Sequence, residues 1–177
     1  MKAVVVYESM YGNTHLIAEA IGSGMREKAD VAVVPVGEAT AAALDDADLV
    51  VAGGPTHAHG MSRPESRTAA VQATEKPDST LEVDPDAEGP GLREWFATLG
   101  SHAANAAAFD TRFDLPAAIT GRASKGIARN LRRHGYTVIA EPESFFVTKQ
   151  THLEADEEAR ARQWGADLAA ILVPASR

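Results

Sequence analysis

The residues best suited to chemistry lie in the loop Ser9 to Thr14, SMYGNT, which follows an apolar run. Ala3 to Tyr7 is short and β-branched, as expected of a central strand in a parallel sheet. After the loop, apolar residues recur at the spacing of one helix face, at Leu16, Ile17, Ala20, Ile21 and Met25. A loop between a strand and a helix N-terminus gathers unpaired backbone N–H groups, and the helix dipole makes that point electropositive. The pattern therefore predicts an anion site.

The residue types in this loop suit a phosphate group. Gly12 lets the backbone bend and approach a ligand closely. Ser9, Asn13 and Thr14 carry short polar side chains that cap a helix or bind phosphate oxygens. Neither GxxxxGK[ST] nor GxGxxG is present, which disfavours ATP and dinucleotide binding through those motifs. A turn that only caps the helix remains the alternative interpretation.

SMYGNT after an N-terminal strand resembles the phosphate loop of the flavodoxin family, whose usual form is [ST]-x-[ST]-G-x-[ST]. Tyr11 departs from that form, since it stands where the family most often has a threonine or serine. The resemblance implies that the cofactor is FMN. It also implies that the FMN phosphate is held by the loop residues Ser9, Met10, Tyr11, Gly12, Asn13 and Thr14.

Predicted strands and helices alternate along the rest of the chain, which indicates a parallel α/β sheet. Pro35 lacks an N–H group for a strand ladder, so its strand is expected at an edge. The later strands are expected at 30–36, 48–52, 103–109 and 136–147, the last with an interruption at EPE. The resemblance implies a flavodoxin-like three-layer sandwich of five parallel strands in the order 2-1-3-4-5. We expect residues 1–177 to form a single domain.

Two further loops are expected around the same ligand. In open α/β sheets, ligands lie outside the carboxyl ends of the strands. The stretch 53–60, GGPTHAHG, contains a GPT element similar to the flavodoxin loop that touches the flavin ring. The resemblance implies that this loop encloses the ring through Pro55, Thr56, His57, Ala58, His59 and Gly60. Gly54 or Gly60 would supply the flexible peptide that responds to the redox state of the flavin.

The third loop is expected after the fourth strand, at 110–121. The resemblance implies that Phe109, Asp110, Thr111 and Arg112 close over the other face of the ring. Flavodoxins often have a tyrosine there, whereas this chain has Phe109 and Phe113. An arginine beside the flavin would favour the reduced, anionic ring and raise its potential.

Two groups of residues invite other functions that the sequence favours less. His57 and His59 face the same way on an extended chain, but no third metal ligand is evident beside them. The stretch 152–156 reads HxExD, which also suits a metal ion, but a structural interpretation is favoured there. We therefore predict no metal site, and interpret Thr151 with Glu154 as a capping box. The basic residues at 125, 129, 132 and 133 are interpreted as a solvated, dipole-complementing helix face rather than an NADPH or anion site.

Composition excludes several classes of function. The chain has 177 residues, a formal net charge of −8 and no cysteine. The negative charge disfavours nucleic acid as a partner, and no apolar run is long enough to cross a membrane. We therefore expect a cytoplasmic protein with no nucleic-acid or membrane partner. The acidic stretch 75–88 is interpreted as a mobile, solvated loop, with a docking surface as the alternative.

The favoured function is noncovalent FMN binding and electron transfer with redox partner proteins, a reductase and an acceptor. This function requires no catalytic residue, and no GxSxG motif is present. One alternative is an FMN-dependent NAD(P)H quinone reductase in which His57 or His59 places the quinone. Others are a protoporphyrinogen-oxidising flavodoxin relative and an interaction module that has lost its flavin.

Overall fold

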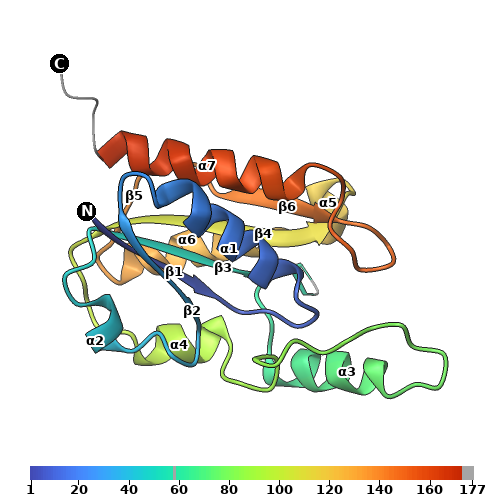
Figure 1. Cartoon of the computed structure of the whole chain (residues 1–177). Helices are drawn as coiled ribbons and strands as arrows, with labels where there is room; N and C mark the ends of the chain where they lie inside the picture. Colours follow the sequence, from blue (N-terminus) through green and yellow to red (C-terminus); the bar gives the residue numbers. More distant parts are fainter. Residues whose placement is uncertain (58, 173–177) are drawn as a thin grey trace.

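The chain forms a parallel sheet covered by helices on both faces (Figure 1). A computed structural model describes residues 1–57 and 59–172. The sheet has the order β2-β1-β3-β4-β5, and β6 pairs with β4 beyond the end of β5. Its strands are β1 (Lys2–Tyr7), β2 (Asp30–Pro35), β3 (Leu49–Pro55), β4 (Asn105–Phe113), β5 (Thr137–Val138) and β6 (Glu143–Val147). The predicted strand order is confirmed, with β2 at the edge as Pro35 indicated.

Alternation along the central strands divides the core into two layers. Val4 and Val6 pack with the apolar faces of α2 (Ala41–Leu44), α4 (Leu92–Thr98) and α6 (Ala123–Arg133). Ala3 and Val5 pack on the opposite face with α1 (Asn13–Met25) and α7 (Glu157–Leu172). Trp95 and Phe96 lie in the first layer. Since successive strand residues face opposite sides, this alternation gives a three-layer sandwich.

Helices α1 and α7 pack through glycines. A Cβ atom built on Gly165 would lie 2.2 Å from the carbonyl oxygen of Ile21, and one on Gly24 would lie 1.9 Å from that of Arg162. Only glycine permits this approach of two backbones. The cost of Gly165 to helix propensity, about 1 kcal/mol, is therefore offset by close packing.

Several helices and the segment after α3 (Pro64–Thr74) lie at the carboxyl ends of the strands. Figure 1 shows the start of α1, α3 and α5 (Ala117–Thr120) at this end of the sheet. The segment after α3 was expected to be a solvated loop. That expectation is wrong for its last part, because Asp84 and Ala87 are buried and the Asp84 N–H donates to Met10 O at 2.8 Å.

Two element boundaries differ from prediction. Strand β4 continues to Phe113, because β3 and β6 both pair with the residues after Phe109. Asp110, Thr111 and Arg112 therefore belong to a strand rather than a loop. Helix α7 begins at Glu157, because Thr151 and Asp156 have left-handed φ values of 65° and 64° that interrupt a helix. The predicted capping box of Thr151 and Glu154 is thus wrong.

Ile171, near the C-terminal end of α7, is 55% exposed and does not face the core. In the part of the chain that the structure covers, no helix is both long and apolar enough to cross a membrane.

Candidate functional site

The loop between β1 and α1 presents backbone donors at one point. Gly12 precedes the first residue of α1 and has a φ of 86°, which glycine adopts without strain. The Gly12 N–H donates to Ser9 Oγ at 3.1 Å. Within the described residues, the N–H groups of Asn13, Thr14 and His15 have no acceptor, as in the first turn of any uncapped helix. These free donors and the helix dipole favour an anion here.

The side chains of the same loop are largely turned inward. Ser9 and Thr14 are buried, and Thr14 Oγ1 lies 2.8 Å from Thr111 Oγ1. The Tyr11 hydroxyl donates to Ala70 O at 3.0 Å, so this aromatic residue ties the loop to α3. The Asn13 amide donates to Thr151 O at 2.8 Å. The backbone, rather than these side chains, therefore supplies the accessible donors.

A cavity of about 160 Å³ opens beside this loop at the carboxyl ends of β1, β3 and β4. It brings together parts of all three predicted loops. Its lining residues are Met10, Tyr11, Asn13, Thr14, Pro55, Thr56, His57, Thr111, Arg112, Phe113, Val147 and Thr151. Below it is called the switch-point cavity, because the direction of the strand order changes between β1 and β3.

The loop after β3 divides between two cavities. Pro55, Thr56 and His57 line the switch-point cavity. His57 and Gly60 then exchange backbone hydrogen bonds of 2.8 and 2.9 Å. His59 and Gly60 line a separate cavity on α6, so they do not join the predicted ring-binding group. Ala58 lies outside the described residues.

His57 is the titratable group of this loop that its surroundings affect most. Burial lowers the pKa of His57 below its usual value, and the positive charge of Arg67 lowers it further. The imidazole is therefore neutral at pH 7, and one of its ring nitrogens remains a donor while the other accepts. A neutral imidazole beside the switch-point cavity suits hydrogen bonding to a polar ring edge.

Two of the four residues predicted around the third loop are placed elsewhere. Phe109 is fully buried, and its ring packs edge-on against Phe145 and Trp164. Asp110 is also fully buried and accepts a hydrogen bond of 2.8 Å from Ser124 N, at the start of α6. Both predictions are corrected, because strand pairing turns Phe109 into the core and Asp110 toward the helix.

Thr111 and Arg112 do line the switch-point cavity. The Arg112 guanidinium donates to Leu115 O at 2.7 Å and to Thr120 Oγ1 at 3.1 Å. It also lies 4.8 Å from the centre of the Phe146 ring. These contacts hold the Arg112 guanidinium against the protein and restrain it from moving freely toward a ligand.

Sequence reasoning missed Thr151 and Val147 as cavity residues. Val147 is the last residue of β6, and Thr151 lies in the segment that follows it. The carboxyl end of β6 lies at the same edge of the sheet as the carboxyl ends of β3 and β4. Thr151 also lines a neighbouring cavity of about 560 Å³, together with Tyr11 and Asn13. The hydrogen bond from Asn13 to Thr151 O therefore lies at the boundary of the two cavities.

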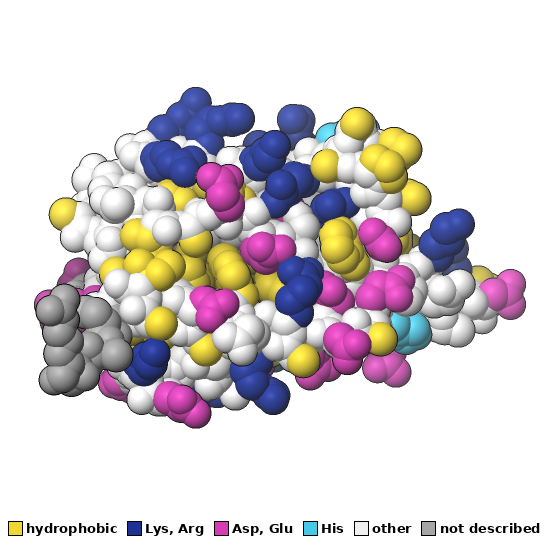
Figure 2. All heavy atoms as spheres, turned by 90° about the horizontal axis from the view of Figure 1, so that it is seen from above, with side chains coloured by type: hydrophobic (Ala, Val, Ile, Leu, Met, Phe, Trp, Pro, Cys, Tyr) yellow, Lys and Arg dark blue, Asp and Glu magenta, His cyan; other side chains and the backbone are white. Residues whose placement is uncertain are grey.

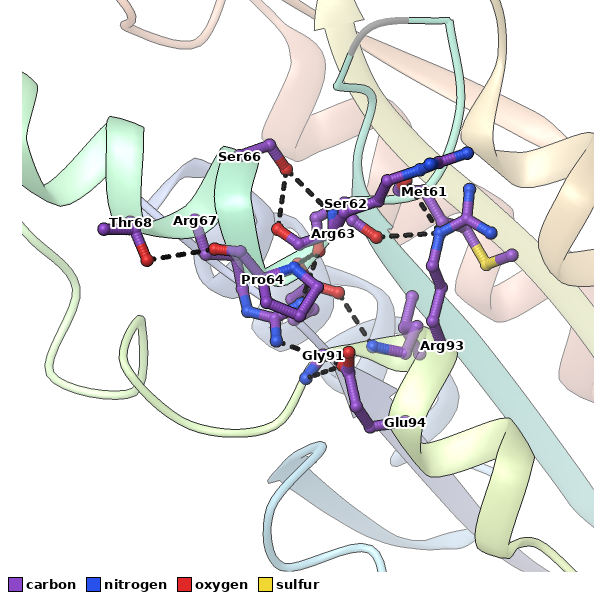
Figure 3. A network of polar contacts seen from close by, with 12 residues as sticks. Met61, Ser62, Arg63, Pro64, Ser66, Arg67, Thr68, Gly91, Arg93 and Glu94 are labelled. Carbon is purple, nitrogen blue, oxygen red and sulfur yellow. Dashed lines mark hydrogen bonds and ion pairs between the residues drawn. The ribbon is translucent and has the colours of Figure 1, made fainter.

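A buried polar network lies next to the loop between β1 and α1. The Glu8 carboxylate, directly after β1, accepts hydrogen bonds from Ser62 and from Leu92 N. Arg67 donates to Ser62 Oγ at 3.1 Å and pairs with Glu94 at 3.1 Å (Figure 3). Burial raises the pKa of Glu8, and its hydrogen bonds oppose that change. The network fixes the starts of α3 and α4 to the end of β1.

A second polar group lies on the other side of the loop. A ring nitrogen of His15 and carboxylate oxygens of Asp84 and Asp86 lie within 4.8 Å of one another. His15 stacks on Tyr7 with ring centres 4.4 Å apart, and the Tyr7 hydroxyl donates to Asp86. Burial and these carboxylates raise the pKa of Tyr7. The group thus places negative charge near the helix N-terminus, where it stabilises the dipole.

Comparison with known proteins agrees with the observed fold. A family model described as a flavodoxin domain matches residues 4–66. That region holds the Ser9–Thr14 loop and the loop after β3. No curated protein matches.

Solved structures extend the likeness over nearly the whole chain. A flavodoxin from the domain Archaea is 24% identical with a TM-score of 0.66, covering 97% of this chain and 99% of its own. Oxidised flavodoxin 1 from Bacillus cereus is 18% identical with a TM-score of 0.65, covering 99% of this chain and 100% of its own. A flavodoxin, WrbA-like protein from Agrobacterium tumefaciens is 23% identical with a TM-score of 0.57, covering 96% of each chain. The fold is therefore flavodoxin-like, and the resemblance seen in the sequence is confirmed.

Proposed function

We propose that this flavodoxin-like protein binds FMN noncovalently at the switch-point cavity and transfers electrons through it. The observation that carries the proposal is the set of free N–H groups at the start of α1, beside a cavity lined by the loops after β3 and β4. A phosphate at one end and a planar ring at the other match these two parts.

The phosphate end fits the residues present. A phosphate monoester carries nearly two negative charges at pH 7 and accepts several hydrogen bonds. The N–H groups of Asn13, Thr14 and His15 would supply them, and the helix dipole adds attraction. Gly12 is required for the backbone to turn there. No lysine or arginine lies in the loop, so the backbone performs the recognition.

The ring end would be enclosed by Pro55, Thr56 and His57 on one side and by Thr111, Arg112 and Phe113 on the other. The cavity of about 160 Å³ is smaller than the roughly 300 Å³ or more of typical ligand sites. Opening the hydrogen bond between Asn13 and Thr151 would join it to the neighbouring cavity of about 560 Å³. We therefore expect the 148–153 segment to move outward when FMN binds.

The bound flavin supplies the redox chemistry, and the chain supplies binding, orientation and charge. Arg112 holds a positive charge at the cavity rim, which favours a reduced, anionic flavin. Neutral His57 would donate to or accept from the ring edge without adding charge. Electrons would be exchanged with redox partner proteins, a reductase and an acceptor.

Titration of FMN with apoprotein, followed by quenching of flavin fluorescence, tests this proposal. We expect saturation at one FMN per chain and a visible spectrum altered from that of free FMN. A linear, unsaturated response would contradict it. The Asn13→Ala variant, which removes the bond to Thr151, should still saturate and should bind FMN faster, because the boundary between the cavities is already open.

A second candidate, an FMN-dependent NAD(P)H quinone reductase, is supported by neutral His57 at the cavity. Its ring N–H would donate to a quinone carbonyl. Steady-state oxidation of NADPH by the FMN-loaded protein, with and without a benzoquinone, separates the two functions. Quinone-dependent turnover that the His57→Ala variant loses would favour the reductase, whereas no turnover leaves the electron carrier.

A further inference from the structure

We propose that the cavity between α4 and α6 is a binding site for a pyrophosphate-bearing small molecule, such as a nucleoside diphosphate. This cavity, called the basic cavity below, has a volume of about 470 Å³. Its cationic lining residues are Arg93, Arg122, Lys125, Arg129 and Arg133, with His59 at the rim. The proposal is independent of flavin binding.

The concentration of charge is unusual for this protein. Five of the 17 lysines and arginines line one cavity, in a chain of net charge −8. No aspartate or glutamate is among the described lining residues. Figure 2, which looks onto the α7 side of the molecule, shows that Lys and Arg side chains on that face are interspersed with Asp and Glu. The cavity is therefore a local positive field on an acidic protein.

Among the residues that the structure describes, none of these five cations forms an ion pair. In the part of the chain that the structure covers, every ion pair involves other basic residues, namely His15, Arg26, Arg67 and Arg160. Lys125, Arg129 and Arg133 are spaced four residues apart on α6, so their heads lie on one helix face. Like charges at this spacing destabilise a helix, and an anion between them would remove the repulsion.

Complementing the helix dipole does not account for the pattern. Arg129 and Arg133 lie toward the C-terminus of α6, where cations are favourable. Arg122 is the N-cap residue and Lys125 lies in the first turn, where the dipole disfavours a cation. Arg93 comes from α4 and belongs to neither end of α6. The interpretation made from the sequence therefore explains two of the cavity cations and leaves three.

Two of the arginines are held in place with donors to spare. Arg93 Nε donates to Met61 O at 3.2 Å and to Ser62 O at 2.9 Å, and Figure 3 shows its terminal nitrogens beyond those bonds. Arg122 Nε donates to Ser144 Oγ at 3.1 Å, and its Nη2 bonds Pro142 O. Anchored guanidinium groups bind phosphate with less loss of side-chain freedom than free ones.

The shape and the number of cations define the ligand class. A volume of about 470 Å³ lies within the range of small-molecule sites, and a concave pocket does not suit a broad protein surface. Cations from two helices surround the space, which suits two linked phosphates better than one. The described lining residues of this cavity and of the switch-point cavity have no member in common.

Calorimetric titration of the purified protein with pyrophosphate, ADP, inorganic phosphate and adenosine tests the proposal. We expect saturable binding of pyrophosphate and ADP, about tenfold weaker binding of phosphate, and none of adenosine. Arg129→Gln should weaken ADP binding about tenfold or more. Arg132→Gln, on the same turn of α6 but outside the cavity, should weaken it less than about twofold.

Excess FMN should leave ADP binding unchanged, and Arg129→Gln should leave FMN binding unchanged. Absence of saturable pyrophosphate binding would overturn the proposal, whether or not the protein binds FMN. Equal loss of ADP affinity in Arg129→Gln and Arg132→Gln would also overturn it, because binding would then reflect general charge. Displacement of ADP by FMN would assign the basic cavity to the flavin instead.

Discussion

The hydroxyl groups of Thr14 and Thr111 lie 2.8 Å apart and join the first turn of α1 to β4. Both side chains are buried, and both line the switch-point cavity. The contact links the expected phosphate end of the site to its expected ring end. The start of α1 and the end of β4 are therefore coupled, and a change at Thr14 reaches both.

Thr14→Ala should weaken FMN binding by about 1–3 kcal/mol, since it leaves the buried Thr111 hydroxyl without its partner and loosens the first turn of α1, whose N–H groups would bind the phosphate. Thr14→Ser should retain most of the affinity. Thr68→Ala removes an exposed hydroxyl that bonds Pro64 O and serves as the control. Unchanged FMN affinity in Thr14→Ala would assign Thr14 to structure alone.

Gly12→Ala should destabilise the protein by about 1 kcal/mol or more, because alanine is strained at a φ of 86°. It should weaken FMN binding as well, since the free N–H groups of α1 would shift. Gly37→Ala is the control, because its new Cβ would lie 3.5 Å from Pro90, an ordinary contact. Urea denaturation and FMN titration measure the two effects. Equal behaviour of both variants would refute the role given to Gly12.

Gly165→Ala should lower the free energy of unfolding by about 1–3 kcal/mol, because its Cβ would lie 2.2 Å from Ile21 O in α1. Gly126→Ala in α6 meets Met61 at 3.6 Å and should be neutral or stabilising by up to about 1 kcal/mol through helix propensity. Chemical denaturation compares the two. A neutral Gly165→Ala variant would mean that α1 and α7 separate readily.

Stability should depend on pH through His57. Its pKa is lowered in the folded protein, so the unfolded chain binds the proton more tightly. The contribution of His57 is therefore present above about pH 6.5 and is lost as the pH falls toward its folded value. Denaturation between pH 5 and 8 should show this fall in wild type and less of it in His57→Gln. His152→Gln alters an exposed histidine and should follow wild type. Parallel curves for wild type and His57→Gln would contradict the inferred burial of the imidazole.

The sequence was sufficient for the fold and for the turn between β1 and α1. Apolar runs such as Ala3 to Tyr7 specify buried parallel strands by composition alone. Gly12 between a strand and an amphipathic helix specifies a turn with free N–H groups. Both features depend on local sequence, which explains why they could be read before the structure was known.

The ring end depends on contacts distant in sequence, and prediction was weaker there. The length of β4 is set by its pairing with β3 and β6, so the polar residues from Asp110 to Arg112 concealed the strand. The burial of Asp110 depends on Ser124 N, fourteen residues away. Thr151 reaches the cavity from the segment after β6, and nothing local in its sequence indicates that position.

The basic cavity was missed for a related reason. Helical spacing within α6 revealed Lys125, Arg129 and Arg133, but Arg93 lies on a different helix. Only the packing of α4 and α6 on the same face of the sheet brings Arg93 to the others. The charge pattern of α6 therefore indicated a basic surface, but it could not indicate that this surface is concave.

The ratio of FMN affinity to riboflavin affinity tests the central claim most directly. The two ligands share the ring and the ribityl chain and differ by the phosphate, which the free N–H groups of α1 would bind. We expect apoprotein to bind FMN about 100-fold or more tightly than riboflavin, since two or more charge-assisted hydrogen bonds are lost with the phosphate. Equal affinities for FMN and riboflavin, or no saturable binding of either, would contradict the account.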